Sequence, residues 1–188
     1  MIGYELAQHH REPNIAWISF VLYPAGWLAC MFSAASGRPW LGAIYAVLVM
    51  VVHVFGARPW ESEFVLLLAA SVLGACSESW LLQAGLVHYA NVSTHSMLAP
   101  YWIVLVWGLF ATILNTALRW LRGQWFAQVL GGLIGGPAAY YVGAQCGAIE
   151  LAGSLRAVLA IGLLWAVTIP TLMSLVTRLD GYDPGNRF

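Results

Sequence analysis

Six long apolar stretches follow one another along this chain of 188 residues, separated by short connectors. A helix that crosses a bilayer needs about 20 consecutive, mostly apolar residues, and each stretch reaches or approaches that length. We therefore expect an all-α fold, a polytopic bundle of about six transmembrane helices that forms one membrane domain over residues 1–188. The expected spans are residues 15–34, 40–55, 64–86, 101–118, 126–147 and 155–176.

The charge content supports a membrane location. Only 9% of the residues are charged and 61% are hydrophobic, whereas a soluble domain usually carries about 25% charged residues. The net charge is zero and the sequence has no basic stripe, which excludes nucleic acid as a partner. The expected partners are membrane lipids, with a second copy of the chain or another membrane protein as alternatives.

The distribution of arginine predicts the orientation. Basic residues gather in the cytoplasmic connectors of membrane proteins. With a cytoplasmic N-terminus, the inner segments hold six arginines and the outer segments hold only Arg38 and Arg156. We therefore predict a multi-pass protein of a bacterial-type inner membrane, with both termini cytoplasmic and the long connector of residues 88–100 outside.

Small residues recur at every fourth position of the fifth apolar stretch. They are Gly131, Gly135, Ala139, Gly143 and Gly147, with Gly132 and Gly136 in a parallel row. Residues four apart share a helix face, and a face of small residues lets another backbone approach closely. This pattern favours tight packing inside the bundle, with dimerisation and a groove for a lipid tail as alternatives.

Glu78 is the most informative single residue. It falls in the third span, in the outer half of the membrane, where an ionisable group is costly and usually faces the bundle interior or a cavity. Ser79 and Glu150 are expected in the same outer layer. Glu78 is either a functional group or a hydrogen-bonded tie between helices.

A second polar layer is expected near the cytoplasmic side. His53 on the second span and Asn115 and Arg119 on the fourth fall at similar depths and are predicted to meet there. Together with Glu78, Ser79 and Glu150 they form the candidate set of ligand-binding or polar-site residues. The alternatives are a hydrogen-bonded core imidazole for His53 and an interfacial anchor for Arg119.

Recognisable catalytic motifs are absent from the sequence. It has no phosphate-binding Gly-Lys loop, no HExxH pair and no Gly-x-Ser-x-Gly elbow. His88 and His95 lie seven residues apart, and the three cysteines are scattered, so neither set has metal-ligand spacing. We expect no metal and no cofactor, and the sequence leans against an enzyme.

Four stretches together resemble a known family. Residues 114–121 read Leu-Asn-Thr-Ala-Leu-Arg-Trp-Leu, close to a Leu-Asn-His-Ser-Leu-Arg-Trp-Leu motif, and the other three are residues 25–30, 74–85 and 131–150. In this order they resemble the small bacterial inner-membrane proteins described as domain of unknown function 2878. The chain departs from that pattern at Thr116 and Ala117, where His-Ser is expected, and at Glu78, where Asp is commoner. The first departure argues against acid–base work by a histidine there.

The resemblance implies a fold and a membrane location but no chemistry. An association of that family with lipid-modifying enzymes favours lipid as the ligand. The leading hypothesis is a protein that binds, moves or presents a lipid or another apolar molecule. The alternatives are a membrane-embedded lipid-modifying enzyme and an accessory subunit of a membrane complex.

Overall fold

A computed structural model of the chain describes residues 13–57, 60–93 and 96–179. Within these ranges it has six α-helices, one short 3-10 helix (η1) and two short strands. Their bounds are α1 Pro13–Ala35, α2 Pro39–Gly56, α3 Trp60–Gln83, β1 Val87–Tyr89, α4 Tyr101–Leu114, η1 Arg119–Leu121, α5 Trp125–Gln145, β2 Ile149–Leu151 and α6 Leu155–Leu179.

The helices confirm the expected all-α bundle. Each predicted span corresponds to one helix, and most boundaries agree within a few residues. Among the described residues, three helices, α2, α3 and α6, are long and apolar enough to cross a membrane, while residues 20–35 of α1 and all of α4 form shorter apolar helices. These helices indicate an integral membrane protein.

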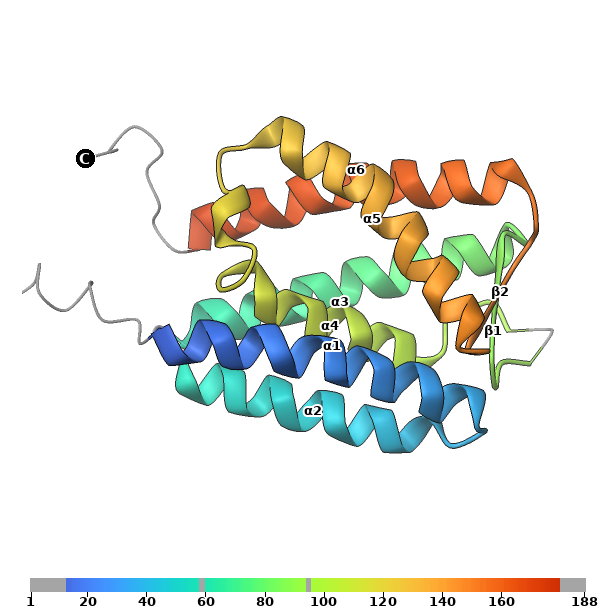
Figure 1. Cartoon of the computed structure of the whole chain (residues 1–188), viewed down its shortest axis with the longest axis horizontal. Helices are drawn as coiled ribbons and strands as arrows, with labels where there is room; N and C mark the ends of the chain where they lie inside the picture. Colours follow the sequence, from blue (N-terminus) through green and yellow to red (C-terminus); the bar gives the residue numbers. More distant parts are fainter. Residues whose placement is uncertain (1–12, 58–59, 94–95, 180–188) are drawn as a thin grey trace, which may run out of the picture.

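The six helices run back and forth along one axis, so that α1 begins and α6 ends at the same end of the bundle (Figure 1). We call this end, where α2 also ends and α3 begins, the first end. Helices α1 to α4 pack on one another, whereas α5 packs mainly on α6, and α6 joins the two groups by packing on α3. The α5–α6 hairpin therefore lies beside a four-helix group, and α1 and α5 have little direct contact.

A small sheet closes the opposite end, which we call the second end. Strands β1 and β2 pair antiparallel, with His88 opposite Glu150 and Tyr89 opposite Ile149. Only a polar connector was predicted here, so the two strands were missed. The pairing ties the connector after α3 to the connector after α5, and it brings Tyr89 into the core, where its side chain is 5% exposed.

Helix α4 is shorter than predicted. It ends at Leu114, not at Leu118, and continues as turns into η1. Its 14 residues span about 21 Å at a rise of 1.5 Å per residue. Nearly all of its side chains are buried against α1, α2 and α3. An irregular backbone at membrane depth is tolerated where protein surrounds it, which explains how this central helix can end early.

The glycines of α5 pack along a different row from the one that the sequence analysis singled out. A Cβ on Gly131 or Gly135 would meet nothing within 4 Å, so these two glycines lie at an open surface. On Gly132 it would lie 2.4 Å from the carbonyl oxygen of Trp165, and on Gly136 it would lie 2.5 Å from the Trp165 ring. The parallel row therefore carries the close contact of α5 with α6.

The remaining small residues of the predicted strip have separate roles. Gly143 is buried, and a Cβ there would lie 2.8 Å from the Ile149 side chain. Gly147 follows the helix with φ at +79°, a left-handed conformation that favours glycine just after a helix end. Ala139 is half-buried and faces an internal cavity described below. The strip is thus not one continuous packing surface within the chain.

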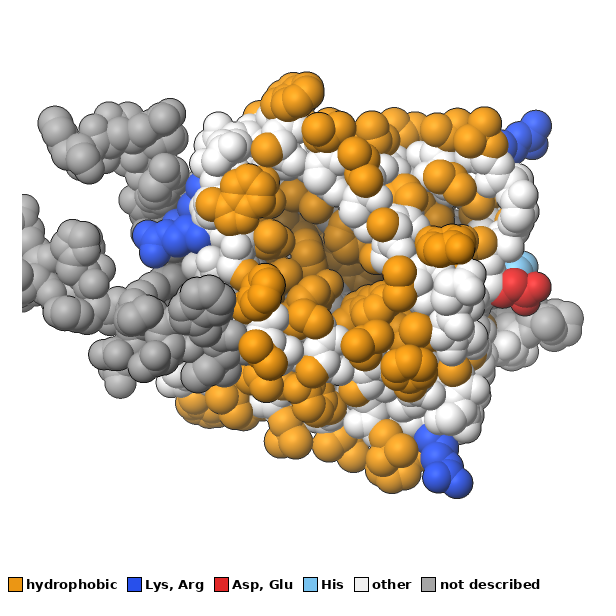
Figure 2. Space-filling model, viewed as in Figure 1, with side chains coloured by type: hydrophobic (Ala, Val, Ile, Leu, Met, Phe, Trp, Pro, Cys, Tyr) orange, Lys and Arg blue, Asp and Glu red, His pale blue; other side chains and the backbone are white. Residues whose placement is uncertain are grey.

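Apolar side chains cover the outside of the bundle along its length. Figure 2 shows this band on one face, with the charged side chains gathered at the two ends of the helices. Large exposed residues include Phe55, Phe126, Leu155 and Val167, each more than 60% exposed. A soluble monomer rarely exposes so large an apolar surface, so this surface suits contact with lipid.

Candidate functional site

Glu78 is the centre of a buried polar cluster near the second end of the bundle. Its side chain is 1% exposed. The Trp107 indole donates a hydrogen bond to Oε1 at 2.6 Å, and the Tyr140 hydroxyl donates to the same oxygen at 2.5 Å. The Tyr89 hydroxyl donates to Oε2. One carboxyl from α3 is therefore held by side chains from α4, α5 and β1.

Glycines make these approaches possible. A Cβ on Gly74, one turn before Glu78 on α3, would lie 2.1 Å from the Trp107 ring. Gly136 gives the same clearance to Trp165 from the α5 side. The two indoles stack between these glycines, with ring centroids 4.6 Å apart and an angle of 25° between their planes. Any larger residue at Gly74 would displace the ring that donates to Glu78.

Among the described residues, the hydrogen-bond partners of Glu78 are all neutral donors. Burial and the nearby Glu78 carboxylate raise the pKa of the Tyr89 phenol well above its usual value, so Tyr89 keeps its proton and donates it. An indole N–H is a donor only. An ionised carboxylate accepts about four hydrogen bonds, so three donors leave part of its capacity unused. None of these three side chains carries a positive charge.

Glu78 also lines a cavity of about 30 Å³ between the two helix groups. We call this space, with its mouth, the α1–α5 groove. Besides Glu78 and its donors Trp107 and Tyr140, its walls include Tyr23 and Trp27 of α1, Val106 and Phe110 of α4, Ala139 of α5 and Trp165 of α6. Figure 2 shows a hollow in this face of the bundle, bordered by apolar side chains. The mouth thus faces the surface that suits lipid.

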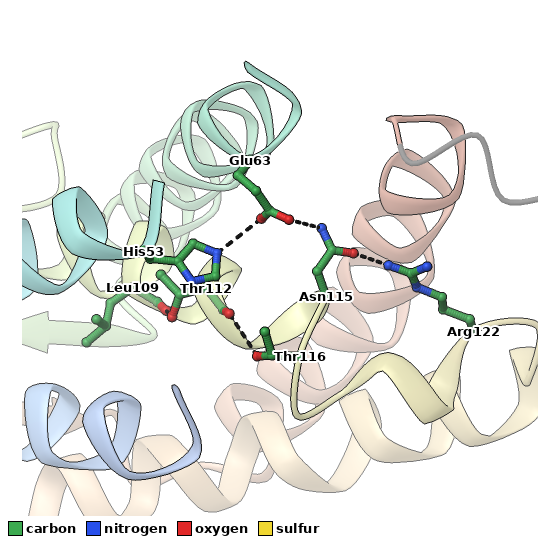
Figure 3. A network of polar contacts seen from close by, with 7 residues as sticks. All are labelled: His53, Glu63, Leu109, Thr112, Asn115, Thr116 and Arg122. Carbon is green, nitrogen blue, oxygen red and sulfur yellow. Dashed lines mark hydrogen bonds and ion pairs between the residues drawn. The ribbon is translucent and has the colours of Figure 1, made fainter. Parts of the chain in front are cut away.

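A second polar network lies near the first end, around Glu63. This side chain is 2% exposed. The amide nitrogen of Asn115 donates to Oε1 at 2.7 Å, and His53 Nε2 lies 3.2 Å from Oε2. Asn115 Oδ1 in turn accepts a hydrogen bond from Arg122 (Figure 3). The network therefore joins α2, α3, the end of α4 and the segment between η1 and α5.

The structure brings some of the predicted site residues together and separates others. His53 and Asn115 converge as expected, but they meet through Glu63, and the arginine that contacts Asn115 is Arg122. Arg119 is exposed on η1. The prediction therefore missed Glu63, which lies at the centre of this network, and named Arg119 where Arg122 makes the contact.

The other two residues predicted for the layer of Glu78, Ser79 and Glu150, do not bond to it. The Ser79 hydroxyl donates to the Ala75 carbonyl and accepts from the Ala99 amide, so it serves the backbone and does not join Glu78. Glu150 is exposed on β2 opposite His88. Tyr89, Trp107 and Tyr140 were not identified from the sequence, because nothing local distinguishes them among 8 tyrosines and 10 tryptophans.

Metal ligands do not cluster in the part of the chain that the structure describes. There, no three His, Cys, Asp or Glu side chains lie close enough to hold one ion. His95 and Thr94, in the predicted outer connector, lie outside the described residues. The described residues thus provide two buried carboxyls. Glu78 lies beside an apolar cavity, and Glu63 lies within a polar network.

Comparison with known proteins gives one match. Neither a curated protein nor a solved structure matches the chain significantly. A family model described as protein of unknown function (DUF2878) matches residues 16–171. This range covers most of α1, all of α2 to α5 and most of α6, including Glu63 and Glu78. The chain therefore belongs to the DUF2878 family of proteins of unknown function.

Proposed function

We propose that this chain is a multi-pass protein of a bacterial-type inner membrane that binds a lipid or another amphipathic molecule in the α1–α5 groove. Binding can serve transport or presentation of that molecule. The observation that carries the proposal is the position of Glu78, a buried carboxyl on the wall of an apolar groove. An ionisable side chain inside a membrane domain commonly marks a ligand or ion pathway.

The shape of the groove supports this function. Because α1 and α5 have little direct contact, the mouth opens sideways, toward the apolar outer surface, and not along the helix axis. An apolar tail can therefore reach the groove from the bilayer without crossing water. Its polar end would meet Glu78, the carboxyl among the described lining residues.

The alternatives have weaker support. A membrane-embedded enzyme needs several reactive groups around one cavity. The described lining of the groove offers one carboxyl, two phenols and aromatic or aliphatic side chains. Ser79, which the sequence places in the same layer as Glu78, bonds to the backbone instead. An accessory subunit would need no ligand and would reveal itself by a retained protein partner.

Native mass spectrometry of the protein, gently extracted from its own membrane, tests the proposal. We expect one retained lipid-sized molecule, which lipid extraction would then identify. Ala139→Leu places extra atoms in the groove and should abolish this adduct. Ala138→Leu is the matched control, because Ala138 is exposed one residue earlier on the same helix. A wild-type protein without an adduct, or an adduct that survives Ala139→Leu undiminished, contradicts the proposal.

The membrane orientation has its own test. Single cysteines at His88 and Arg119, in a background without the natural cysteines, place a label at opposite ends of the bundle, and both positions are exposed. With both termini cytoplasmic, an impermeant thiol reagent should label position 88 in intact cells. It should label position 119 only after the membrane is opened. The reverse pattern would invert the orientation.

A further inference from the structure

We propose that the Glu78 end of the α1–α5 groove takes the protonated primary amine of an amphipathic molecule whose apolar tail extends through the groove mouth. This inference rests on the proposed function and names the chemical class of its ligand. It goes beyond the choice of a lipid, because most amphipathic molecules carry no free amine.

The charge of the Glu78 carboxylate favours a cationic ligand. Glu78 accepts from Trp107, Tyr140 and Tyr89, and none of these donors is cationic. A buried charge is costly unless an opposite charge or enough hydrogen bonds compensate it. Three donors satisfy most of the acceptor sites of an ionised carboxylate, and no cationic side chain among the described residues bonds to it to balance its charge. A ligand ammonium supplies both the missing charge and a further donor.

Aromatic side chains form one wall of the groove beside Glu78. Trp107 and Trp165 stack at 4.6 Å, and the Phe110 ring lies edge-on to both, with centroids 6.4 Å and 5.4 Å away. Tyr23 follows at 5.9 Å from Phe110. Aromatic faces attract cations by about 0.5–2 kcal/mol, the larger values where water is excluded. The wall therefore favours a cation, whereas an anionic head group would meet the Glu78 carboxylate.

The size of the cavity limits the head group of the ligand. The cavity has a volume of about 30 Å³, and a single water molecule needs roughly 10–15 Å³. A primary ammonium is about as large as a water molecule and fits. A trimethylammonium group needs more room for its three methyl groups, and it has no N–H to donate to Glu78. The geometry therefore favours a primary amine over a quaternary one.

A ligand series on the purified full-length protein tests this assignment. Octylamine, octanol and octyltrimethylammonium share one tail and differ in the head group. Affinities are measured from the ligand-dependent shift in melting temperature, with the bound mass checked by native mass spectrometry. We expect octylamine to bind at least tenfold more tightly than either analogue, a result that needs no variant. Equal affinities for octylamine and octanol would overturn the amine assignment.

Two variants locate the effect. Glu78→Gln should lower octylamine affinity at least tenfold and leave octanol affinity unchanged. Glu150→Gln, an exposed carboxamide at the same end of the bundle, should change neither. If Glu78→Gln retains wild-type octylamine affinity, the assignment is wrong. If it fails to fold, the wild-type ligand series still decides.

The same experiment separates this inference from the proposed function. Ala139→Leu should abolish binding of octylamine and octanol alike. If it does so while the two ligands bind equally well to the wild type, the groove binds amphipathic molecules without reading an amine. If Ala139→Leu leaves both affinities unchanged, the groove is not the binding site and both proposals fail.

Discussion

Helix α3 carries two buried glutamates, Glu63 and Glu78, whose hydrogen-bond partners differ in kind. Glu63, near the first end of the bundle, is held by His53 and Asn115, and Asn115 is held in turn by Arg122. Glu78, near the second end, is held by an indole and two phenols and faces a cavity. Both are almost fully buried, at 2% and 1% exposed. Burial alone therefore does not distinguish a structural carboxyl from a binding one.

The difference lies in what completes each carboxyl. The Glu63 network includes a histidine and an arginine and joins four parts of the chain, so its chemistry is satisfied by the fold itself. Glu78 has only neutral donors in the described part of the chain, and an apolar opening lies beside it. We infer that Glu63 stabilises the bundle and that Glu78 is available to a ligand.

The largest expected effect is on stability at Glu63. Glu63→Leu would leave the His53 and Asn115 donors buried without their acceptor and the network without its negative charge. Breaking a buried charged network in this way costs about 3–5 kcal/mol. Thermal or denaturant unfolding in detergent measures this loss. Glu78→Leu also leaves its three donors without an acceptor, but it removes a carboxyl that no described cationic side chain balances, so we expect a smaller loss. The opposite ranking would reverse our assignment of the two carboxyls.

A smaller effect is expected on the α5–α6 hairpin that forms one side of the groove. Gly132→Ala would place a Cβ 2.4 Å from the Trp165 carbonyl oxygen, so the helices must separate. Overpacking of this kind costs about 1–3 kcal/mol. Gly131→Ala is the control and should stabilise the helix by about 0.5–1 kcal/mol, because nothing lies within 4 Å of its Cβ. Equal unfolding curves for the two variants would contradict the packing described here. Dissociation of a dimer by Gly131→Ala would show that this open row is an interface between copies.

A smaller effect still is expected from the donors to Glu78. Tyr140→Phe removes one hydrogen bond to a buried carboxyl, a change worth about 1–2 kcal/mol. Tyr141→Phe, one residue along and exposed on the same helix, should change the unfolding free energy by less than about 0.5 kcal/mol. A double variant with Glu78→Gln should show less than the sum of the single effects, because the two side chains interact. Strict additivity would mean that the hydrogen bond contributes nothing.

The sequence predicted the helices well because lipid imposes a length and a composition that are visible locally. It also predicted that Glu78 is buried and that His53 and Asn115 converge, since both follow from depth along each span. Glu63 was missed because the third span was placed from residue 64, whereas α3 begins at Trp60. The C-terminal ends of α2 and α4 contact its first turn through His53 and Asn115, and no local sequence pattern predicts this contact.

The rest depended on how each helix is rotated about its axis. A helix that is apolar on all sides gives no periodic pattern to indicate which face is inward. For this reason Gly132 and Gly136 could not be distinguished from Gly131 and Gly135 as the packed row. The pairing of β1 with β2 joins segments about 60 residues apart by three residues each, which leaves no sequence pattern to read.

Photo-crosslinking in the native membrane tests the central claim, that the α1–α5 groove holds an amphipathic ligand, most directly. A photoreactive residue at position 139 faces the groove, and one at position 138 faces the outer surface. Our account predicts that position 139 captures one dominant molecule and loses it in Glu78→Gln, while position 138 captures the bulk lipids of the membrane. The same lipid mixture at both positions, unaffected by Glu78→Gln, would contradict a selective site.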